Sequence, residues 1–190
     1  MRKSFVLGAL AVVCLSTSAW ATVFGLDLKG VAGNGLLPGN EPGSIGGGTG
    51  GEIGAGITYD DSSNVLTLAG VVGWGSSQGF TDLSSLANNS HIHGPTPSAN
   101  GNGFTETAPV LINLVRSSNA VTGGTFTTSP IVLTEPQEAE LLAGRYYVNI
   151  HTTNNSGGEL RGFLVVPEPA SATLILISAA GLIARRHRRA

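Results

Sequence analysis

YYVNIHTTNNSGGELRG, residues Tyr146–Gly162, decides the fold of this chain, and SHIHGP, residues Ser90–Pro95, is its partner. Successive side chains of a β-strand point to opposite faces. For Tyr146–Thr152 this alternation predicts one apolar face and one face that carries Tyr147 and His151. The stretch therefore predicts a strand that is half buried in a core, followed by a turn and a second strand.

The same alternation gathers polar side chains. His91 and His93 share one face of their strand, and Glu159 and Arg161 share one face of theirs. If the three segments are neighbours in one sheet, a single surface collects His91, His93, His151, Glu159 and Arg161. The predicted structural or binding motif consists of these five residues together with Gly94, Asn149, Thr152 and Gly162.

Short strands and turn residues make up the rest of the central region. Strands are predicted at Val23–Val31, Glu52–Tyr59, Asn64–Gly73, Pro109–Val115, Val121–Thr128 and Ile131–Leu133. The glycine-rich stretch Ala32–Gly51 is predicted to be a loop. About eight short strands separated by turns predict an all-β fold, an immunoglobulin-like or Greek-key β-sandwich.

One short helix is predicted at Thr134–Ala143. Thr134 can cap it, Pro136 suits its first turn, and Gly144 can end it. A helix of this length is too short to organise the fold.

The N-terminus is predicted to be a secretory signal peptide, residues 1–21. Two basic residues precede the apolar run Phe5–Leu15, and small residues at Ala19 and Ala21 place the cleavage after Ala21. A membrane anchor is the alternative, but the run is short for a bilayer. Cleavage removes Cys14, the only cysteine, so the exported domain is expected to contain no disulfide.

The C-terminus, residues 166–190, has three parts in order. The breaker Pro167-Glu168-Pro169 precedes the apolar run Ala170–Ala184, predicted to be a transmembrane helix, and a basic cluster expected on the cytoplasmic side follows. The cluster consists of Arg185, Arg186, Arg188 and Arg189, with His187 among them. This end resembles the PEP-CTERM sorting signal, with a plain tail anchor as the alternative. The resemblance implies an exosortase-type processing enzyme as a partner, transient insertion in the inner membrane, and delivery to the cell surface or outside, often beside exopolysaccharide.

Charge excludes one class of partner. Between Thr22 and Val165 the chain has eleven acidic and only four basic residues. Nucleic-acid binding needs clustered lysine and arginine against phosphates. The central region, residues 22–165, is therefore not expected to bind nucleic acid.

The order of motifs in the central region resembles the CHRD domain, a family named for its occurrence in chordin. A hairpin with a polar turn, HIHGP, an apolar strand, an acidic helical turn, AGRYYVNIHT and GELRG follow one another from about Phe24 to Val165. The glycine-rich insertion Ala32–Gly51 departs from the common pattern. The resemblance implies a β-sandwich of immunoglobulin-like topology, found in extracellular proteins, with no reaction established for the family.

Three interpretations of the motif remain open. In the first, the side chains are structural. His91 and His93 bond to loop carbonyls, and His151 and Thr152 fix the turn Asn154–Gly158. Glu159 and Arg161 form a cross-strand or partly buried pair with backbone carbonyls. In the second, His91, His93 and His151 bind a metal, because three imidazoles with an open position are typical of catalytic zinc or copper sites. In the third, the motif contacts carbohydrate or peptide, with Tyr146, Tyr147, Trp74 and the imidazoles as the stacking groups.

These observations predict an exported, non-enzymatic module of the cell surface or extracellular matrix, structural or adhesive, with exopolysaccharide or surface proteins as its partners and no committed cofactor. The alternative is a metal-dependent copper or zinc enzyme, redox or hydrolytic, that uses His91, His93 and His151. The His-x-His pattern is also similar to copper–zinc superoxide dismutases, but the further His ligands and the bridging His-Asp arrangement are missing from the sequence.

Overall fold

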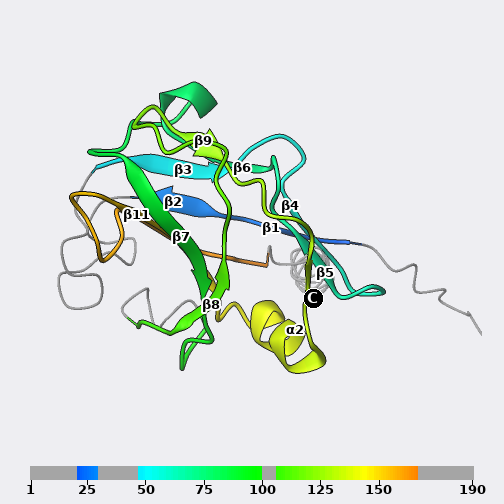
Figure 1. The fold of residues 1–190 in the computed structure, drawn as a ribbon. Helices are drawn as coiled ribbons and strands as arrows, with labels where there is room; N and C mark the ends of the chain where they lie inside the picture. Colours follow the sequence, from blue (N-terminus) through cyan, green and yellow to red (C-terminus); the bar gives the residue numbers. More distant parts are fainter. Residues whose placement is uncertain (1–20, 30–46, 100–105, 167–190) are drawn as a thin grey trace, which may run out of the picture.

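The computed structural model describes residues 21–29, 47–99 and 106–166, which are mostly antiparallel β-structure (Figure 1). The predicted signal peptide and sorting signal lie almost wholly outside these residues, and the predicted transmembrane helix lies entirely outside them. Within the described residues, no helix has the length and apolar character needed to cross a bilayer.

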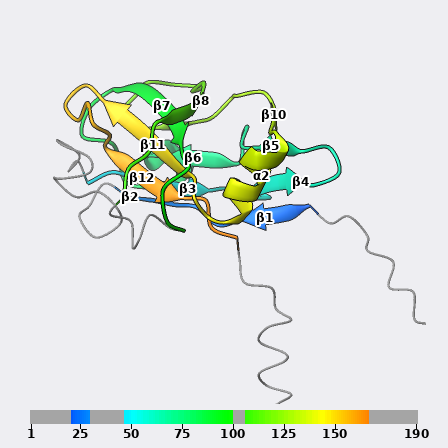
Figure 2. The ribbon, with the colours of Figure 1, turned by 90° about the horizontal axis from the view of Figure 1, so that it is seen from below.

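Two antiparallel sheets form the fold, which confirms the all-β prediction. The smaller sheet has the strand order β1-β4-β5-β10, with bounds Thr22–Phe24, Ile57–Asp60, Val65–Thr67 and Ile131–Val132. The larger sheet has the order β8-β7-β11-β12-β2-β3-β6-β9, with bounds Val110–Asn113, Ala87–His93, Tyr147–Thr152, Leu160–Phe163, Asp27–Lys29, Thr49–Glu52, Val72–Trp74 and Gly124–Thr125. Figure 2 shows the strands of the smaller sheet gathered at one end of the domain, beside α2.

The chain passes repeatedly from one sheet to the other. β1 belongs to the smaller sheet and β2 to the larger, with only Gly25 and Leu26 between them. At this bend the backbone N–H of Leu26 donates a hydrogen bond to the carboxylate of Glu52. Gly25 exchanges two backbone hydrogen bonds with Val165, at 2.8 and 2.9 Å. The start and the end of the domain are therefore joined directly.

Apolar side chains from both sheets fill one core. Phe24, Ile57, Tyr59 and Leu66 from the smaller sheet are buried in the same cluster as residues of the larger sheet. The members from the larger sheet are Leu28, Val72, Trp74, Ala87, Ile92, Val148, Ile150 and Leu160. Burial of apolar area is the main favourable term in folding, and here it also fixes which face of each strand points inward.

Helix α2 spans Glu135–Leu142 and confirms the predicted helix. The backbone N–H of Thr134 donates to Oε1 of Gln137 at 2.9 Å, and the Thr134 hydroxyl donates to the same oxygen at 3.1 Å. Leu141 is the buried residue of the helix. Gly144 follows with φ of 68°, a left-handed conformation that suits glycine and ends the helix. The described residues also contain the short 3₁₀ helix η1, Ser76–Gln78.

Strand β3 corrects the prediction that Ala32–Gly51 is all loop, because its first three residues, Thr49–Gly51, lie in that stretch. A side chain at Gly50 would place its Cβ 2.6 Å from the carbonyl oxygen of Gly73, and one at Gly51 would lie 2.7 Å from that of Leu26. Neighbouring backbones therefore approach too closely for any residue but glycine. The sequence suggested that these glycines belong to a loop, but the structure shows that they are needed for close packing of a strand.

Candidate functional site

Strands β7, β11 and β12 bring the motif segments together, as the sequence predicts. In the antiparallel pair of β7 and β11, His93 lies opposite Tyr147 and His91 lies opposite Asn149. In the pair of β11 and β12, Asn149 lies opposite Arg161. On the other face of these strands Ile92, Val148, Ile150 and Leu160 are completely buried in the core. The alternation of apolar and polar residues therefore gives the sheet one inner face and one motif-bearing face.

Three imidazoles form a cluster, which we call the His trio: His91, His93 and His151. One ring nitrogen from each residue lies within 4.8 Å of the others. Nδ1 of His91 lies 3.2 Å from Nε2 of His151, and the ring centroids of these two residues are 5.0 Å apart. His91 is nearly buried, at 7 % exposed, whereas His93 and His151 are partly exposed.

Backbone carbonyls orient two rings of the trio. Nδ1 of His93 lies 2.9 Å from the carbonyl oxygen of Ala108, and Nδ1 of His151 lies 2.8 Å from that of Ser156. A carbonyl oxygen only accepts hydrogen bonds, so each Nδ1 carries the proton and each Nε2 carries a lone pair. Nε2 of His93 is buried and has no hydrogen-bond partner among the described residues. The loop-carbonyl bonds of the structural interpretation are therefore present for His93, and His151 bonds to its turn as predicted.

The trio is held in its neutral form. The pKa of His91 is lowered to about 4, mainly by burial, with charge repulsion from His151, His93 and Arg116 as the smaller causes. Burial also lowers the pKa of His93 and of His151, against the opposing effect of the carbonyl that each ring bonds. At neutral pH the three rings are thus uncharged and carry lone pairs, the form in which imidazole binds metals.

A stack of side chains continues from the trio. The ring of Tyr147 lies nearly parallel to that of His93, with centroids 4.9 Å apart and an angle of 6°. The guanidinium carbon of Arg161 lies 3.8 Å from the Tyr147 centroid, and its Nη2 donates to the carbonyl of Glu106. Arg161 is completely buried. This cation–π contact joins Arg161 to Tyr147, which stacks on His93, and the charge of Arg161 also contributes to the lowered pKa of His93.

Glu159 belongs to a different network from the one the sequence predicts. Its carboxylate accepts hydrogen bonds from the Ser84 hydroxyl at 2.6 Å, the Thr152 hydroxyl at 2.7 Å and the Asn155 amide at 3.0 Å. The backbone N–H of Ser84 donates to it as well, at 2.5 Å. The network joins the turn between β11 and β12 to the segment before β7. Ser84 and Asn155 were missed as partners of Glu159. Nothing in the sequence marks a serine 75 residues away as a partner of a glutamate.

Other motif residues shape the backbone. The Asn149 amide donates to the carbonyl of Gly157 at 3.1 Å and so holds the same turn. A Cβ at Gly94 would lie 2.1 Å from Cδ1 of Tyr146, and one at Gly162 would lie 2.4 Å from the carbonyl oxygen of Asp27. These positions of the motif are therefore explained by close packing.

The prediction that Tyr146, Tyr147 and Trp74 contact carbohydrate or peptide is wrong, because all three side chains are buried. Tyr146 and Tyr147 are each 1 % exposed, and Trp74 is 0 % exposed. Trp74 packs against Phe126 with ring centroids 5.1 Å apart, and Tyr147 is covered by the stack. Aromatic rings are favoured in the core for their large apolar area, and this use leaves no face for a sugar to stack on.

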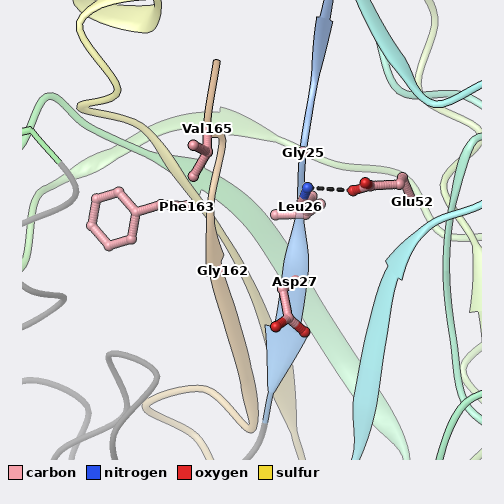
Figure 3. Close-up of a pocket in the computed structure, with 7 residues that line it drawn as sticks. All are labelled: Gly25, Leu26, Asp27, Glu52, Gly162, Phe163 and Val165. Carbon is pink, nitrogen blue, oxygen red and sulfur yellow. Dashed lines mark hydrogen bonds between the residues drawn. The ribbon is translucent and has the colours of Figure 1, made fainter. Parts of the chain in front are cut away.

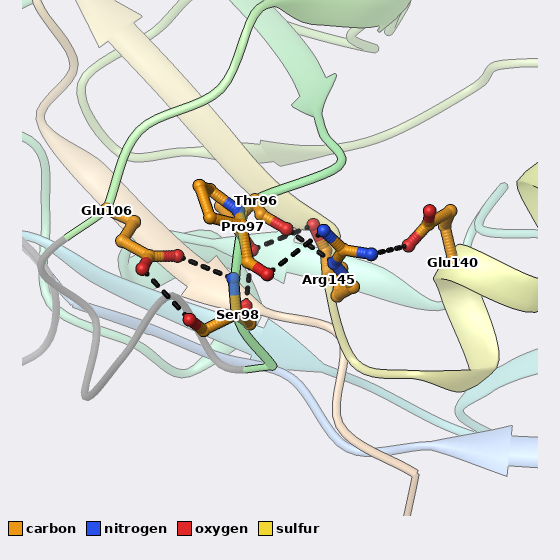
Figure 4. Close-up of polar contacts among 6 residues, drawn as sticks. All are labelled: Thr96, Pro97, Ser98, Glu106, Glu140 and Arg145. Carbon is orange, nitrogen blue, oxygen red and sulfur yellow. Dashed lines mark hydrogen bonds and ion pairs between the residues drawn. The ribbon is translucent and has the colours of Figure 1, made fainter.

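Two further features lie apart from the His trio. Arg145 donates to the carbonyl of Pro97 at 3.0 Å and pairs with Glu140 at 2.6 Å. The Glu106 carboxylate accepts from the backbone N–H of Ser98 at 2.8 Å. Figure 4 shows both sets of contacts. These contacts hold the loop after β7. A pocket of about 320 Å³ lies at the bend between β1 and β2 (Figure 3). Its lining residues are Gly25, Leu26, Asp27, Glu52, Gly162, Phe163 and Val165.

The fold and the site together define a class of protein: a small antiparallel all-β domain of two sheets, with a polar turn held by a buried glutamate and three imidazoles on one face of β7 and β11. The CHRD domain model matches residues 37–164, and the chain belongs to this family. The resemblance is therefore confirmed for most of its predicted extent. No curated protein and no solved structure matches the chain.

Proposed function

We propose that this chain is an exported module of the cell surface or extracellular matrix, in which the CHRD domain is structural or adhesive and performs no catalysis. One observation carries the proposal: the motif's Thr152, Glu159 and Arg161 are completely buried, and their side chains contact other parts of the domain. Such side chains stabilise a small domain that is expected to contain no disulfide. Exopolysaccharide or other surface proteins are the proposed partners.

The two ends of the chain support the proposed localisation. Residues 1–21 have the three parts of a secretory signal, and residues 166–190 have the breaker, apolar run and arginine cluster of a PEP-CTERM tail. We propose that the tail is held transiently in the inner membrane and is then removed by an exosortase-type enzyme. The immunoglobulin-like description of the two-sheet topology is part of the same proposal.

The test follows processing of the full chain in a Gram-negative host that has an exosortase-type enzyme. An antibody against the central region is expected to detect a shortened protein at the cell surface. With Glu168→Ala in the breaker, full-length protein is expected to accumulate in the inner membrane. Glu135→Ala, an exposed change at the start of α2, serves as the control and should be processed like the unchanged chain. Full-length protein in the cytoplasm, or identical processing of Glu168→Ala, would overturn the proposal.

A second candidate function is a metal-dependent redox or hydrolytic enzyme. One observation favours it: ring nitrogens of the His trio lie within 4.8 Å of one another, and His93 and His151 are partly exposed. Loading with copper or zinc followed by substrate turnover is its test. Binding of a metal without turnover would leave the non-catalytic module as the function.

A further inference from the structure

We infer that His91, His93 and His151 form a binding site for one transition-metal ion of the copper or zinc type, with copper preferred. The inference goes beyond the proposed surface role, which needs no metal, and it does not depend on export. It rests on donor atoms, their hydrogen-bond partners, their separation and their access to solvent.

In His93 and His151, the hydrogen bond made by one ring nitrogen shows that the other ring nitrogen is the one available to bind a metal. Nδ1 of His93 bonds to the carbonyl of Ala108, and Nδ1 of His151 bonds to that of Ser156, so both Nε2 atoms present lone pairs. Metal-bound histidines almost always donate their other ring N–H to a carbonyl, carboxylate or water. His93 and His151 therefore already make the hydrogen bond to a carbonyl that metal-bound histidines typically make with their other ring nitrogen.

Within the described residues, the trio cannot satisfy its own lone pairs. Nδ1 of His91 can donate its proton to Nε2 of His151, 3.2 Å away. The lone pair of His93 Nε2 is then left buried without a donor. Buried polar atoms are nearly always bonded, and an exception calls for an explanation such as an ion. With the proton of neutral His91 on its Nε2 instead of its Nδ1, a single cation among the three nitrogens accepts all three lone pairs.

The spacing suits a metal with short bonds to nitrogen. Zinc–imidazole bonds of about 2.0–2.1 Å in a tetrahedral site place ligand nitrogens roughly 3.4 Å apart. The pair of His91 and His151 is already at 3.2 Å, and no ligand atom lies more than 4.8 Å from another. Small rotations of the rings close the remaining gap. His93 and His151 are partly exposed as residues, so we expect an ion to reach the trio from their side.

The chemistry of the ligands selects the ion. Calcium and magnesium prefer oxygen ligands, and the trio offers none. Imidazole suits copper, zinc and nickel, and copper(II) binds more tightly than zinc at the same nitrogen site. The charged groups near the trio are Arg116, whose Nη1 bonds Ser90 beside His91, and Arg161 behind Tyr147. Their positive charge disfavours a doubly charged ion relative to a singly charged one, so copper(I) is also expected to bind.

The experiment uses the full chain, purified in detergent and freed of metal by a chelator. Every sample carries Cys14→Ser and His187→Ala, which remove the only thiol and the fourth histidine of the chain. Copper(II), copper(I) and zinc are titrated in turn against a competing chromophoric chelator. We expect one equivalent of copper per chain, with zinc bound more weakly at the same site.

His93→Ala is expected to weaken copper binding by more than the 10–100-fold that is typical of losing an outer-shell partner. Asn113→Ala is the matched control, because this exposed residue lies opposite His91 on β8 and its change leaves all three imidazoles in place. Circular dichroism checks that each variant folds. If His93→Ala does not fold, electron paramagnetic resonance of the copper(II) complex of the His93-containing chain supplies the answer through coupling to imidazole nitrogens.

Three results would overturn the inference. The first is that the chain binds less than one equivalent of copper at micromolar concentration. The second is that folded His93→Ala and Asn113→Ala bind copper with equal affinity. The third is that the copper(II) spectrum shows no coupling to imidazole nitrogens. None of these results bears on the sorting of the chain, so failure of this inference and failure of the proposed function are distinguishable.

Discussion

Glu159 shows how a single buried residue can carry much of a turn's stability. Its carboxylate is completely buried and is surrounded by neutral donors from Ser84, Thr152 and Asn155. A buried charge is costly unless hydrogen bonds replace its water, and hydrogen bonds to a charged group are stronger than neutral ones. The position therefore requires a carboxylate, although on the sequence it resembles any glutamate that begins a strand.

We predict that Glu159→Gln destabilises the domain by about 2–4 kcal/mol. The glutamine side chain has one oxygen that can accept, but its NH₂ group replaces the other oxygen and faces groups that also donate. At least one of the two hydrogen bonds from Ser84 is therefore lost. Urea unfolding measures the change. Glu140→Gln is the control, because its ion pair with Arg145 lies near the surface and is worth about 0–1 kcal/mol. Equal effects of the two changes would contradict the assignment of Glu159.

A comparison of Gly94 with Gly54 distinguishes the cost of close packing from the cost of backbone conformation. Gly94 and Gly54 both have positive φ, 154° and 62°. A Cβ at Gly94 would lie 2.1 Å from Tyr146, whereas a Cβ at Gly54 would meet nothing within 4 Å. We predict that Gly94→Ala costs at least about 3 kcal/mol and that Gly54→Ala costs only about 1–2 kcal/mol. Thermal unfolding of both variants is the measurement, and a cost at Gly94 no larger than at Gly54 would refute the packing argument.

At the scale of elements, β7 and β11 explain why the trio forms. The register sets His91 and His93 opposite alternate residues of β11, and shifts of register occur on both sides of the trio. One shift falls between His151 and Thr152 in the pair with β7, and the other falls between Ile92 and His93 in the pair with β8. Such irregularities re-aim side chains and are frequent beside functional sites. All three histidines lie in the regular part of the pairing between β7 and β11, so regular alternation positions them, and the irregularities lie next to them.

Helix α2 depends on its first turn, and we predict that Gln137→Ala destabilises the domain by about 0.5–1 kcal/mol. Oε1 of Gln137 accepts from both the backbone and the hydroxyl of Thr134, and the variant leaves these donors to water. Gln137→Glu is the matched control, because glutamate supplies an oxygen at the same place in a capping box. Chemical unfolding should show a loss of stability for Gln137→Ala and none for Gln137→Glu. Equal losses of stability in the two variants would exclude the capping role.

At the scale of the whole molecule, both sheets share one core, and phenol groups are buried within it. Burial raises the pKa of Tyr59 to about 12 from 10.0, with the nearby Glu138 carboxylate as the second cause. Burial likewise raises the pKa of Tyr146 to about 12. Charging either phenol in the folded domain is therefore unfavourable.

We predict that the domain loses stability as the pH rises from about 10 to about 12. Below this window both states keep the phenol protons, and stability does not depend on them. Within it the unfolded chain releases protons first, so unfolding becomes more favourable with each increase in pH. Denaturant unfolding at several pH values measures the slope, and Tyr59→Phe should reduce it. An unchanged slope in that variant would show that Tyr59 has no part in the effect.

The sequence by itself determined the fold class, the position of α2 and the pairing of the motif strands. These predictions hold because alternation and capping are local properties: Tyr146–Thr152 carries its inner and outer faces in its own order of residues, and Thr134 caps the helix beside it. The same rule placed His91 and His93 on one face and correctly brought His151 beside them.

Only the tertiary structure decided what lies next to each side chain. It put the glycines of β3 in a strand, gave Glu159 the distant Ser84 instead of Arg161, and buried the tyrosines proposed for sugar contact. The physical reason is that hydrogen-bond partners and packing depend on segments far apart in the chain, which meet only when apolar burial has brought the two sheets together. A pattern fixes the direction of a side chain, and the fold fixes its neighbour.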